Sequence, residues 1–394
     1  MTTSGFDPEQ GAQDGPPPPR QPAPPPYTAP GTGYEQALSA PIPAPPQTPP
    51  YGIPSPSYGV PDGSLDPLPI PTAAGRGGAA AASDSVLIGL WGAPRAGKTT
   101  YLAALPVAAM QQQRQGSANW VVVGMSQDAN DFLIENVTRL TSERRFPVPT
   151  LAPVGMSWSF TGTERGALRP RGRDVSFVLE IQDFSGESFW KKDTRSVDPA
   201  AVDHLARSQG IIYLFDPLLD AEEHTRSLDY FYATLTQLAA RVRDEGRFHR
   251  NRLPHHVSVC VTKFDHPSVF RPSVEARWVT QEQTGSRIPR IPDNLGNAYF
   301  DWVCDDFRGA TARLVRDGLR NFFHEDRISY YASSAIGFRL NPQNIFDYRN
   351  YANVEMVDGE PRICTPPIPI NVIEPLVDLE RKIRTDRRRR WRRP

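Results

Sequence analysis

A short apolar run followed at once by a glycine-rich turn and a helical segment constrains the fold more than any other feature of the chain. Residues 86–91, Val-Leu-Ile-Gly-Leu-Trp, have the length and composition of a buried parallel strand. The turn matches the pattern Gly-x-x-x-x-Gly-Lys-[Ser/Thr], in which backbone N–H groups at a helix N-terminus face phosphate oxygens. The matching residues and the next helical residue are Gly92, Ala93, Pro94, Arg95, Ala96, Gly97, Lys98, Thr99 and Thr100. The sequence therefore predicts a phosphate cradle, in which Lys98 reaches the β- and γ-phosphates and the Thr99 hydroxyl ligates Mg²⁺.

Apolar runs of strand length alternate with helical segments along the rest of the chain. Further strands are expected near residues 119–124, 155–161, 175–182, 210–215, 256–262 and 327–332. Helices are expected over residues 100–113, 198–208 and 220–244, and the pairs Asp198-Pro199 and Asp220 with Glu223 are typical of helix starts. This alternation predicts an α/β fold: a doubly wound, mostly parallel sheet of the P-loop NTPase type with helices on both faces.

Proline and charge are distributed unevenly and divide the chain into three parts. Residues 1–82 hold 22 of the 42 prolines and few large aliphatic residues, so we expect a disordered N-terminal tail. Residues 83–379 are expected to form one folded domain with insertions. Residues 380–394 contain nine bases and two acids and are expected to form a basic C-terminal tail. That tail is either a solvated charge run or a contact for an anionic membrane surface, an acidic partner or nucleic acid. Three scattered cysteines and no apolar run of membrane-spanning length favour the cytoplasm.

A second motif follows the strand expected at 175–182, which ends in Asp183-Phe184-Ser185-Gly186. An acidic residue at the carboxyl edge of a strand beside the phosphate cradle can hold Mg²⁺ through water, and a glycine three residues later can donate its backbone N–H to the γ-phosphate. An Asp-x-x-Gly pattern alone is weak, but its position after an apolar strand makes it more specific. The predicted metal ligand is Asp183, and Gly186 is a predicted catalytic residue.

Two further motifs concern the base of a nucleotide. The strand at 256–262 runs into Thr262-Lys263-Phe264-Asp265, and the strand at 327–332 runs into Ser333-Ser334-Ala335. A carboxylate at Asp265 can accept hydrogen bonds from N1–H and the 2-amino group of guanine, a pair of donors that adenine lacks. The stem of Lys263 can lie over the base, and the loop with Ser334 and Ala335 can offer a backbone N–H to the guanine O6. The sequence therefore predicts a guanine-nucleotide site that includes Thr262, Lys263, Asp265, Ser334 and Ala335.

Together these motifs resemble those of P-loop GTPases of the translation-factor and Ras-like (TRAFAC) class, over residues 84–340. The segment 369–376, Pro-Ile-Asn-Val-Ile-Glu-Pro-Leu, and the length between motifs are also similar to bacterial double-GTPase families linked to conflict systems. The resemblance implies a regulatory switch that binds GTP or GDP with Mg²⁺, hydrolyses GTP to GDP and phosphate, and signals to a protein effector. The loops near 145–165 and 183–197 are expected to order around the γ-phosphate.

Two positions bear on catalysis besides Lys98. Glu187 follows Gly186 directly, where Ras-like members place a water-orienting glutamine, and a carboxylate near the γ-phosphate predicts slow hydrolysis. Arg95 occupies a loop position that resembles the arginine finger supplied in cis by guanylate-binding and atlastin-type GTPases. Its charge could neutralise the transferred phosphoryl group. Alternatively, Arg95 could be a solvated loop residue or could contact the switch segment.

The second hydroxyl ligand of Mg²⁺ is expected from a loop near residue 150. Thr150 is the candidate, with Thr161 and Thr163 as alternatives. A further alternative is that none of these threonines binds the metal. Two other functions remain open: a nucleotide-binding scaffold that has lost turnover, favoured by Glu187, and an ATPase in which the base motif is accidental.

Overall fold

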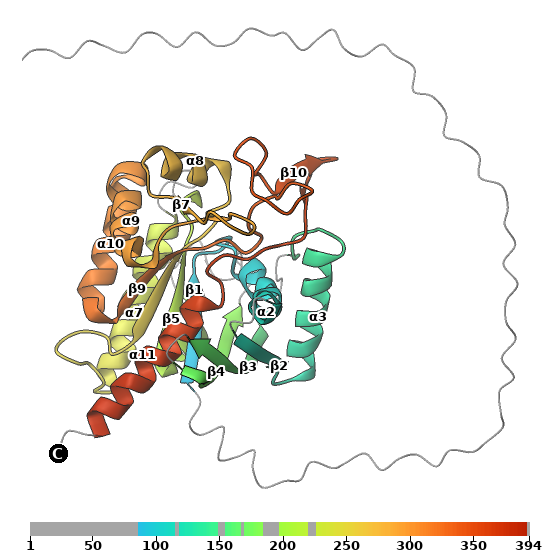
Figure 1. Cartoon of the computed structure of the whole chain (residues 1–394). Helices are drawn as coiled ribbons and strands as arrows, with labels where there is room; N and C mark the ends of the chain where they lie inside the picture. The colour runs from blue at the N-terminus through green and yellow to red at the C-terminus, as the bar shows by residue number, and fades with distance from the viewer. Residues whose placement is uncertain are drawn as a thin grey trace, which may run out of the picture. The chain divides into compact units, whose positions relative to one another are not determined.

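The computed structural model describes residues 86–114, 118–148, 154–166, 169–183, 197–219 and 226–391. The Pro-rich segment 1–82 lies outside these residues, and its expected disorder stays a prediction. Within the described part, a seven-stranded sheet carries helices on both faces (Figure 1). The strands are β1 (Val86–Gly92), β2 (Ala118–Gly124), β3 (Val154–Gly166), β4 (Arg169–Asp183), β5 (Gly210–Phe215), β6 (His256–Val261) and β9 (Ile328–Ala332).

The strand order is β2-β3-β4-β1-β5-β6-β9. Neighbours from β4 to β9 run parallel, whereas β2 with β3 and β3 with β4 pair antiparallel. The predicted α/β fold with a mostly parallel sheet is therefore confirmed. All seven expected strands are present, but β3 and β4 are longer than the sequence suggested and form one antiparallel ribbon. The chain winds outward in both directions from β1, which lies between β4 and β5.

Side chains of helices on both layers pack closely against glycines of the sheet. A Cβ atom on Gly89 would lie 3.0 Å from the Leu205 side chain, and one on Gly210 would lie 3.4 Å from the Leu379 side chain. On one face, Trp91 of β1 stacks on Phe231 of α7 at 5.2 Å between ring centroids. The helices are α2 (Lys98–Arg114), α3 (Gln127–Thr141), α5 (Pro199–Arg207), α7 (Arg226–Asp244), α8 (Pro267–Glu275), α9 (Gly296–Trp302), α10 (Ala310–Phe322) and α11 (Glu374–Trp391).

Short elements complete the described part of the chain. They are the strand pairs β7 (Thr280–Gln281) with β8 (Pro289–Arg290) and β10 (Val354–Val357) with β11 (Glu360–Ile363), and the helical turns η1 (Asp293–Leu295), η2 (Val303–Arg308) and η3 (Glu325–Arg327). The expected cap of α5 is present, because the Asp198 side chain accepts a hydrogen bond from the Ala200 N–H at 2.8 Å. The expected capping pair before α7 lies outside the described residues.

The expected start of the basic tail at residue 380 needs correction. Helix α11 continues to Trp391 and packs on β1, β4, β5 and β6. Leu376, Leu379 and Ile383 are buried at helical spacing, and even the Glu380 side chain is inaccessible and pairs with Arg384. The apolar residues recur every three to four positions among the charges, so one side of a strongly basic helix is fixed against the sheet. Residues 380–388 therefore continue the folded domain.

Replacing Leu379 with alanine tests this packing. Leu379 is fully buried, and deleting its side chain should lower the free energy of unfolding by about 3 kcal/mol, through lost transfer energy and a residual cavity. Urea denaturation measures the change. The matched control is Arg381→Ala on the same helix, where the side chain is 51% exposed and the expected change is below about 0.5 kcal/mol. Equal, small effects of both substitutions would show that α11 does not belong to the core.

Candidate functional site

The glycine-rich turn lies between β1 and α2, at the carboxyl edge of the parallel strands. The Lys98 ammonium donates hydrogen bonds to the carbonyl oxygens of Gly92 and Ala93, at 3.1 and 3.2 Å. The Ala96 N–H donates to the Ala93 carbonyl at 3.1 Å, which closes the turn. The lysine side chain thus folds back over the loop that precedes its own helix. Thr99 and Thr100 follow in the first turn of α2, both partly buried.

Backbone conformation explains the glycines of this loop. Gly97 has φ of 90°, and Arg95, exposed on the loop, has φ of 66°. Left-handed residues alternating with right-handed ones turn successive N–H groups toward the same side and create an anion-binding concavity. At Gly92 the reason is space, since a Cβ atom there would lie 3.1 Å from the Leu214 carbonyl oxygen. The loop therefore has the backbone shape that the motif predicts.

The segment after β6 is anchored by its aromatic residue. The Phe264 side chain is completely buried against three rings, with centroid distances of 5.7 Å to Phe270, 6.4 Å to Tyr299 and 5.8 Å to Phe338. The Thr262 N–H donates to the Phe215 carbonyl at 2.8 Å, which extends the ladder between β5 and β6 by one residue. This anchoring fixes the neighbouring Asp265 at the end of the sheet.

Asp265 and Ser334 meet, although 69 residues separate them in the sequence. The Ser334 hydroxyl donates to Asp265 Oδ1 at 2.5 Å and accepts from the Gly337 N–H at 2.7 Å. Burial raises the pKa of Asp265 to about 6, and the hydrogen bond from Ser334 opposes part of this shift. The sequence predicted both residues for one site, and the fold brings them together. Ala335, next along the chain, is partly buried.

Asp216 is a residue of this region that the sequence interpretation missed. It directly follows β5, its side chain is fully buried, and its Oδ2 lies 2.6 Å from the Lys263 ammonium. Its Oδ1 accepts from the Leu218 N–H at 2.9 Å. The ion pair sets the direction of the Lys263 side chain, whose backbone is left-handed with φ of 57°. The available signal was an acidic residue immediately after a wholly apolar strand, at the same edge as Asp265.

The remaining predicted residues are placed only in part. Asp183 ends β4, where its backbone pairs with Val154, and its side chain is outside the described part. Thr150, Gly186 and Glu187 also lie outside it. The alternatives Thr161 and Thr163 both lie within β3 and pair with β2. Because β3 pairs with β2 on one side and with β4 on the other, both threonines lie inside the sheet and not in a loop.

Over the described residues, no group of three or more His, Cys, Asp or Glu side chains could hold a metal ion. Among those same residues, no helix is long and apolar enough to span a membrane.

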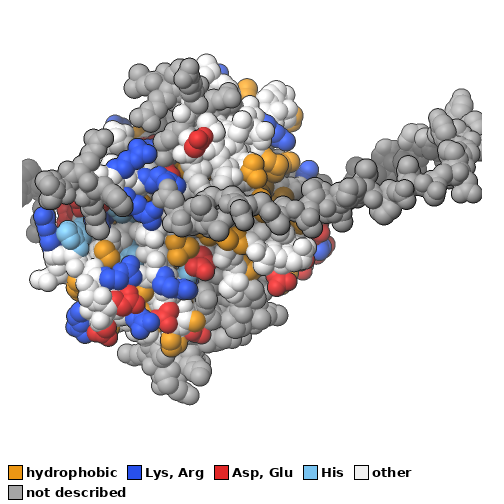
Figure 2. All heavy atoms as spheres, turned by 90° about the horizontal axis from the view of Figure 1, so that it is seen from below, with side chains coloured by type: hydrophobic (Ala, Val, Ile, Leu, Met, Phe, Trp, Pro, Cys, Tyr) orange, Lys and Arg blue, Asp and Glu red, His pale blue; other side chains and the backbone are white. Residues whose placement is uncertain are grey.

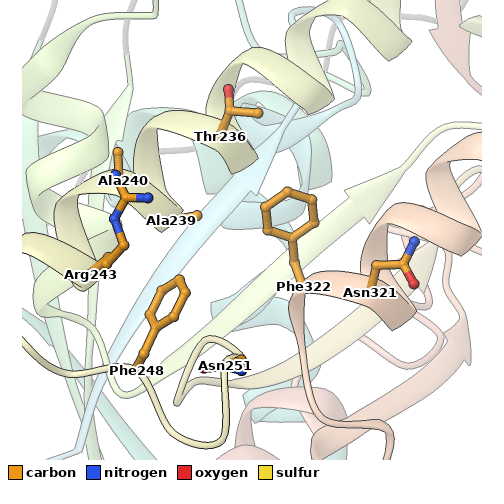
Figure 3. A pocket seen from close by; sticks show the side chains of 8 residues that line it. All are labelled: Thr236, Ala239, Ala240, Arg243, Phe248, Asn251, Asn321 and Phe322. Carbon is orange, nitrogen blue, oxygen red and sulfur yellow. The ribbon is translucent and has the colours of Figure 1, made fainter.

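Two cavities of the described part lie away from the motif residues. One, of about 420 Å³, opens between α7 and α10 and is bordered by Thr236, Arg243 and Phe322 (Figure 3). The other, of about 450 Å³, lies at the amino ends of β5 and β6. Neither is lined by the residues that the motifs predicted.

The comparisons with known proteins were made on sequence and on structure. No protein-family model matches the chain, and no curated protein does. Among solved structures, the S. cerevisiae Ski7 GTPase-like domain bound to GTP aligns with a TM-score of 0.33 and 12% identity, covering 76% of this chain and 50% of that one. The same domain bound to GDP and inorganic phosphate aligns with a TM-score of 0.34 and 13% identity, covering 76% of this chain and 50% of that one. Sup35 complexed with GDP aligns with a TM-score of 0.25 and 12% identity, covering 66% of this chain and 41% of that one. This chain therefore spans half or less of the length of these structures, and its site has to be argued from its own residues.

Proposed function

We propose that this chain is a regulatory GTPase that binds Mg-GTP and converts it to GDP and phosphate. The observation that supports this most is the gathering of four loops at one edge of the sheet. The cradle follows β1, Asp216 follows β5, Asp265 follows β6 and Ser334 follows β9, and these strands are parallel neighbours. In open parallel sheets, ligands bind beyond the carboxyl ends of the strands at the point where the strand order reverses, which is where β1 lies.

Lys98 and the loop backbone would hold the phosphates. The ammonium now bonds two carbonyl oxygens of the loop, so in the complex it would exchange these neutral acceptors for charged phosphate oxygens, which form stronger hydrogen bonds. Thr99 in the first turn of α2 and Asp183 at the end of β4 would hold Mg²⁺. The ion would neutralise charge on the phosphates when bound. Arg95, Gly186 and Glu187 are the proposed groups around the γ-phosphate.

Asp265 would select the base. Its two oxygens offer about four lone pairs, so the hydrogen bond from Ser334 leaves capacity for the N1–H and 2-amino donors of guanine. An adenine in the same place would present no matching donor pair and would leave a buried carboxylate unpaired, which is costly. The Ala335 backbone N–H would complete recognition at O6. The Lys263 stem, held by Asp216, would cover one face of the ring.

Nucleotide titration tests the proposal. GTP, GDP and ATP are titrated into the full chain with Mg²⁺ by calorimetry, and phosphate release is followed separately. We expect GTP to bind at least about a hundredfold more tightly than ATP, because the unpaired donors and acceptors of the wrong base penalise it. Equal affinities, or a preference for ATP, would overturn guanine selection and favour the ATPase. Tight GTP binding without phosphate release would favour the scaffold.

The raised pKa of Asp265 predicts that GTP affinity depends on pH. Because the pKa is about 6, the carboxyl is protonated below that pH and ionised above it, and only the ionised form accepts both guanine bonds. Affinity should therefore increase between about pH 5 and pH 7, by up to about tenfold per pH unit below the pKa. Asp265→Asn is the control, since the phosphates of GTP titrate equally in both proteins. A pH profile that is the same in the two proteins would contradict the assignment.

The proposal includes an effector that reads the nucleotide state through segments next to the γ-phosphate. The expected segment 145–165 is shortened by the fold, because residues from Val154 onward belong to β3. The proposed switches are therefore residues 145–153 and 183–197. Contact of the basic end of α11 with an anionic membrane surface or an acidic partner, and a cytoplasmic location, remain proposals as well.

A further inference from the structure

Strand β2 forms one end of the seven-stranded sheet, beside α3 (Figure 1). The two ends of the sheet are protected differently. At the other end, α9 covers β9 so closely that a Cβ atom on Gly296 would lie 2.2 Å from the Tyr330 carbonyl oxygen. Strand β2 pairs with β3 on one side, and no described strand pairs with its other side. We name this unpaired side the β2 edge.

The hydrogen bonds of β2 show which of its backbone groups lie at the β2 edge. In an antiparallel pair, residues that bond to the neighbouring strand alternate with residues whose N–H and C=O point away from it. The Met125 N–H donates to the Ser157 carbonyl at 2.8 Å, so the odd-numbered residues of β2 bond to β3 and the even-numbered ones point outward. Gly124 agrees with this pattern, because its N–H and C=O are both bonded by the Asn130 side chain, at 2.8 and 3.3 Å.

Trp120 and Val122 therefore present their N–H and C=O groups outward, and these groups have no hydrogen-bond partner among the described residues. Backbone groups in this state bond to water or to another strand. Natural sheets protect such edges with charged residues, proline or a bulge. Strand β2, Ala-Asn-Trp-Val-Val-Val-Gly, contains no charge and no proline, and its register with β3 has no shift. The β2 edge is therefore suited to receive a further strand.

The side chains next to the β2 edge are apolar on both faces of the sheet. Trp120 is buried on the face of α2, where its indole N–H donates to Gln112 at 2.8 Å. On the opposite face, Val121, Val123 and Met125 are 59%, 48% and 60% exposed. Seen from below, Lys and Arg side chains gather mainly on the left, the side where α11 ends in Figure 1, and hydrophobic side chains reach the surface toward the right (Figure 2). The basic surface near α11 thus lies away from β2.

We propose that the β2 edges of two copies of this chain pair antiparallel about a two-fold axis and form a dimer with one continuous sheet. With Trp120 opposite Val122 of the second copy, both residues exchange N–H···O=C bonds in both copies. Val121 then meets Val121 of the second copy at the axis, so that exposed apolar side chains contact each other. Pairing of identical strands closes both edges at once, which gives a dimer and not a fibre.

Charge favours a second copy as the occupant of the β2 edge. Arg114 ends α2 just before β2, Asp128 lies in the first turn of α3 just after it, and both are exposed. Helices α2 and α3 pack together on the same face of the sheet. In an antiparallel pair the start of each strand meets the end of the other, so Arg114 approaches Asp128 of the second copy. The segment 1–82 is a poorer occupant, because it holds 22 prolines and proline donates no ladder bond.

The proposed dimer does not depend on the proposed GTPase function, because β2 carries none of the residues assigned to the nucleotide. Sedimentation velocity of the full chain without nucleotide tests it. A short seam belongs to the class of small, weak interfaces, so the chain is followed up to about 200 µM and a dissociation constant between about 10 and 100 µM is expected.

The first variant removes a backbone donor of the β2 edge. Val122→Pro should raise the dissociation constant at least about tenfold, because proline lacks the outward N–H but is tolerated where that group faces away from the sheet. Val122→Ala is the matched control: it shortens the same side chain and keeps the N–H. We expect it to change the dissociation constant less than about threefold.

A second pair of variants covers the case in which Val122→Pro folds poorly. Val121→Lys keeps every backbone group and sets like charges opposite each other at the axis, so the dissociation constant should rise about fivefold or more. Met356→Lys makes a similar exchange on β10, at a side chain that is 68% exposed, and should leave the dimer unchanged. A chain that is monomeric at the highest concentration would overturn the proposal. A dimer that Val122→Pro and Val121→Lys leave intact, or that Val121→Lys and Met356→Lys weaken equally, would also overturn it.

Discussion

Replacing Asp265 with asparagine is expected to weaken GTP binding by about a hundredfold or more and to improve binding of xanthosine triphosphate. The carboxylate can accept from two guanine donors, whereas an asparagine amide has a single acceptor oxygen and turns its NH₂ donor toward the 2-amino group. Xanthine has a carbonyl at that position, so the amide N–H gains a partner. Binding of GTP, xanthosine triphosphate and ATP, measured by displacement of a fluorescent nucleotide, gives the three affinities.

The surroundings of Asp265 make this substitution conservative for the fold. Asparagine has the same shape, and its carbonyl oxygen can still accept from the Ser334 hydroxyl, which now bonds Asp265 Oδ1 at 2.5 Å. The control is Ser334→Ala, which keeps the carboxylate but removes its neutral donor, and GTP affinity should fall by only about tenfold. Equal losses of GTP and xanthosine triphosphate in Asp265→Asn would mean that the side chain supports the loop and does not read the base.

Much of the fold could be predicted because strand length and apolarity are local properties. The fully buried strand β5 is a continuous apolar run, and β6 is apolar except for His256 and Ser258. The ends of both strands were expected within a residue of where they lie. The antiparallel ribbon β3–β4 was underestimated because residues 162–174 are polar and rich in glycine and arginine. Residues 162–166 and 169–174 are held in an extended conformation by pairing between β3 and β4, and the pairing partner is not visible in the local pattern.

The candidate site was predictable where a motif follows a strand, and not where a contact joins distant segments. The cradle and the Asp265 loop were found because each follows an apolar run directly. Ile370 forms an antiparallel bridge with Ser334, and the Tyr101 hydroxyl donates to the Val372 carbonyl at 2.5 Å, 271 residues away. These contacts tie the segment just before α11 to the loop that follows β9 and to α2. Such long-range contacts are not visible in the local sequence, which is why this helix, basic in composition, was mistaken for a tail.

Replacing Arg95 with alanine is expected to slow GTP hydrolysis by about a thousandfold while changing GTP affinity much less. An arginine acting in cis stabilises charge that develops on the phosphoryl group as it is transferred, so its contribution is realised mainly in the transition state. Its position supports this proposed role, because Arg95 is exposed at the turn of the cradle between Gly92 and Gly97. Single-turnover phosphate release at saturating GTP, together with the dissociation constant, separates the two effects.

The backbone of Arg95 determines which substitution and control are informative. Its φ of 66° is left-handed, and alanine bears a similar conformational cost, so Arg95→Ala changes the side chain without relaxing the loop as glycine would. Arg250, also exposed and with φ of 50°, lies in the turn after α7, and Arg250→Ala should leave hydrolysis unchanged. Arg95→Lys should recover only part of the rate, since an ammonium keeps the charge but lacks the planar pair of donors. An unchanged rate in Arg95→Ala would remove this arginine from the mechanism, and hydrolysis would then have to rely on groups of the 183–197 segment.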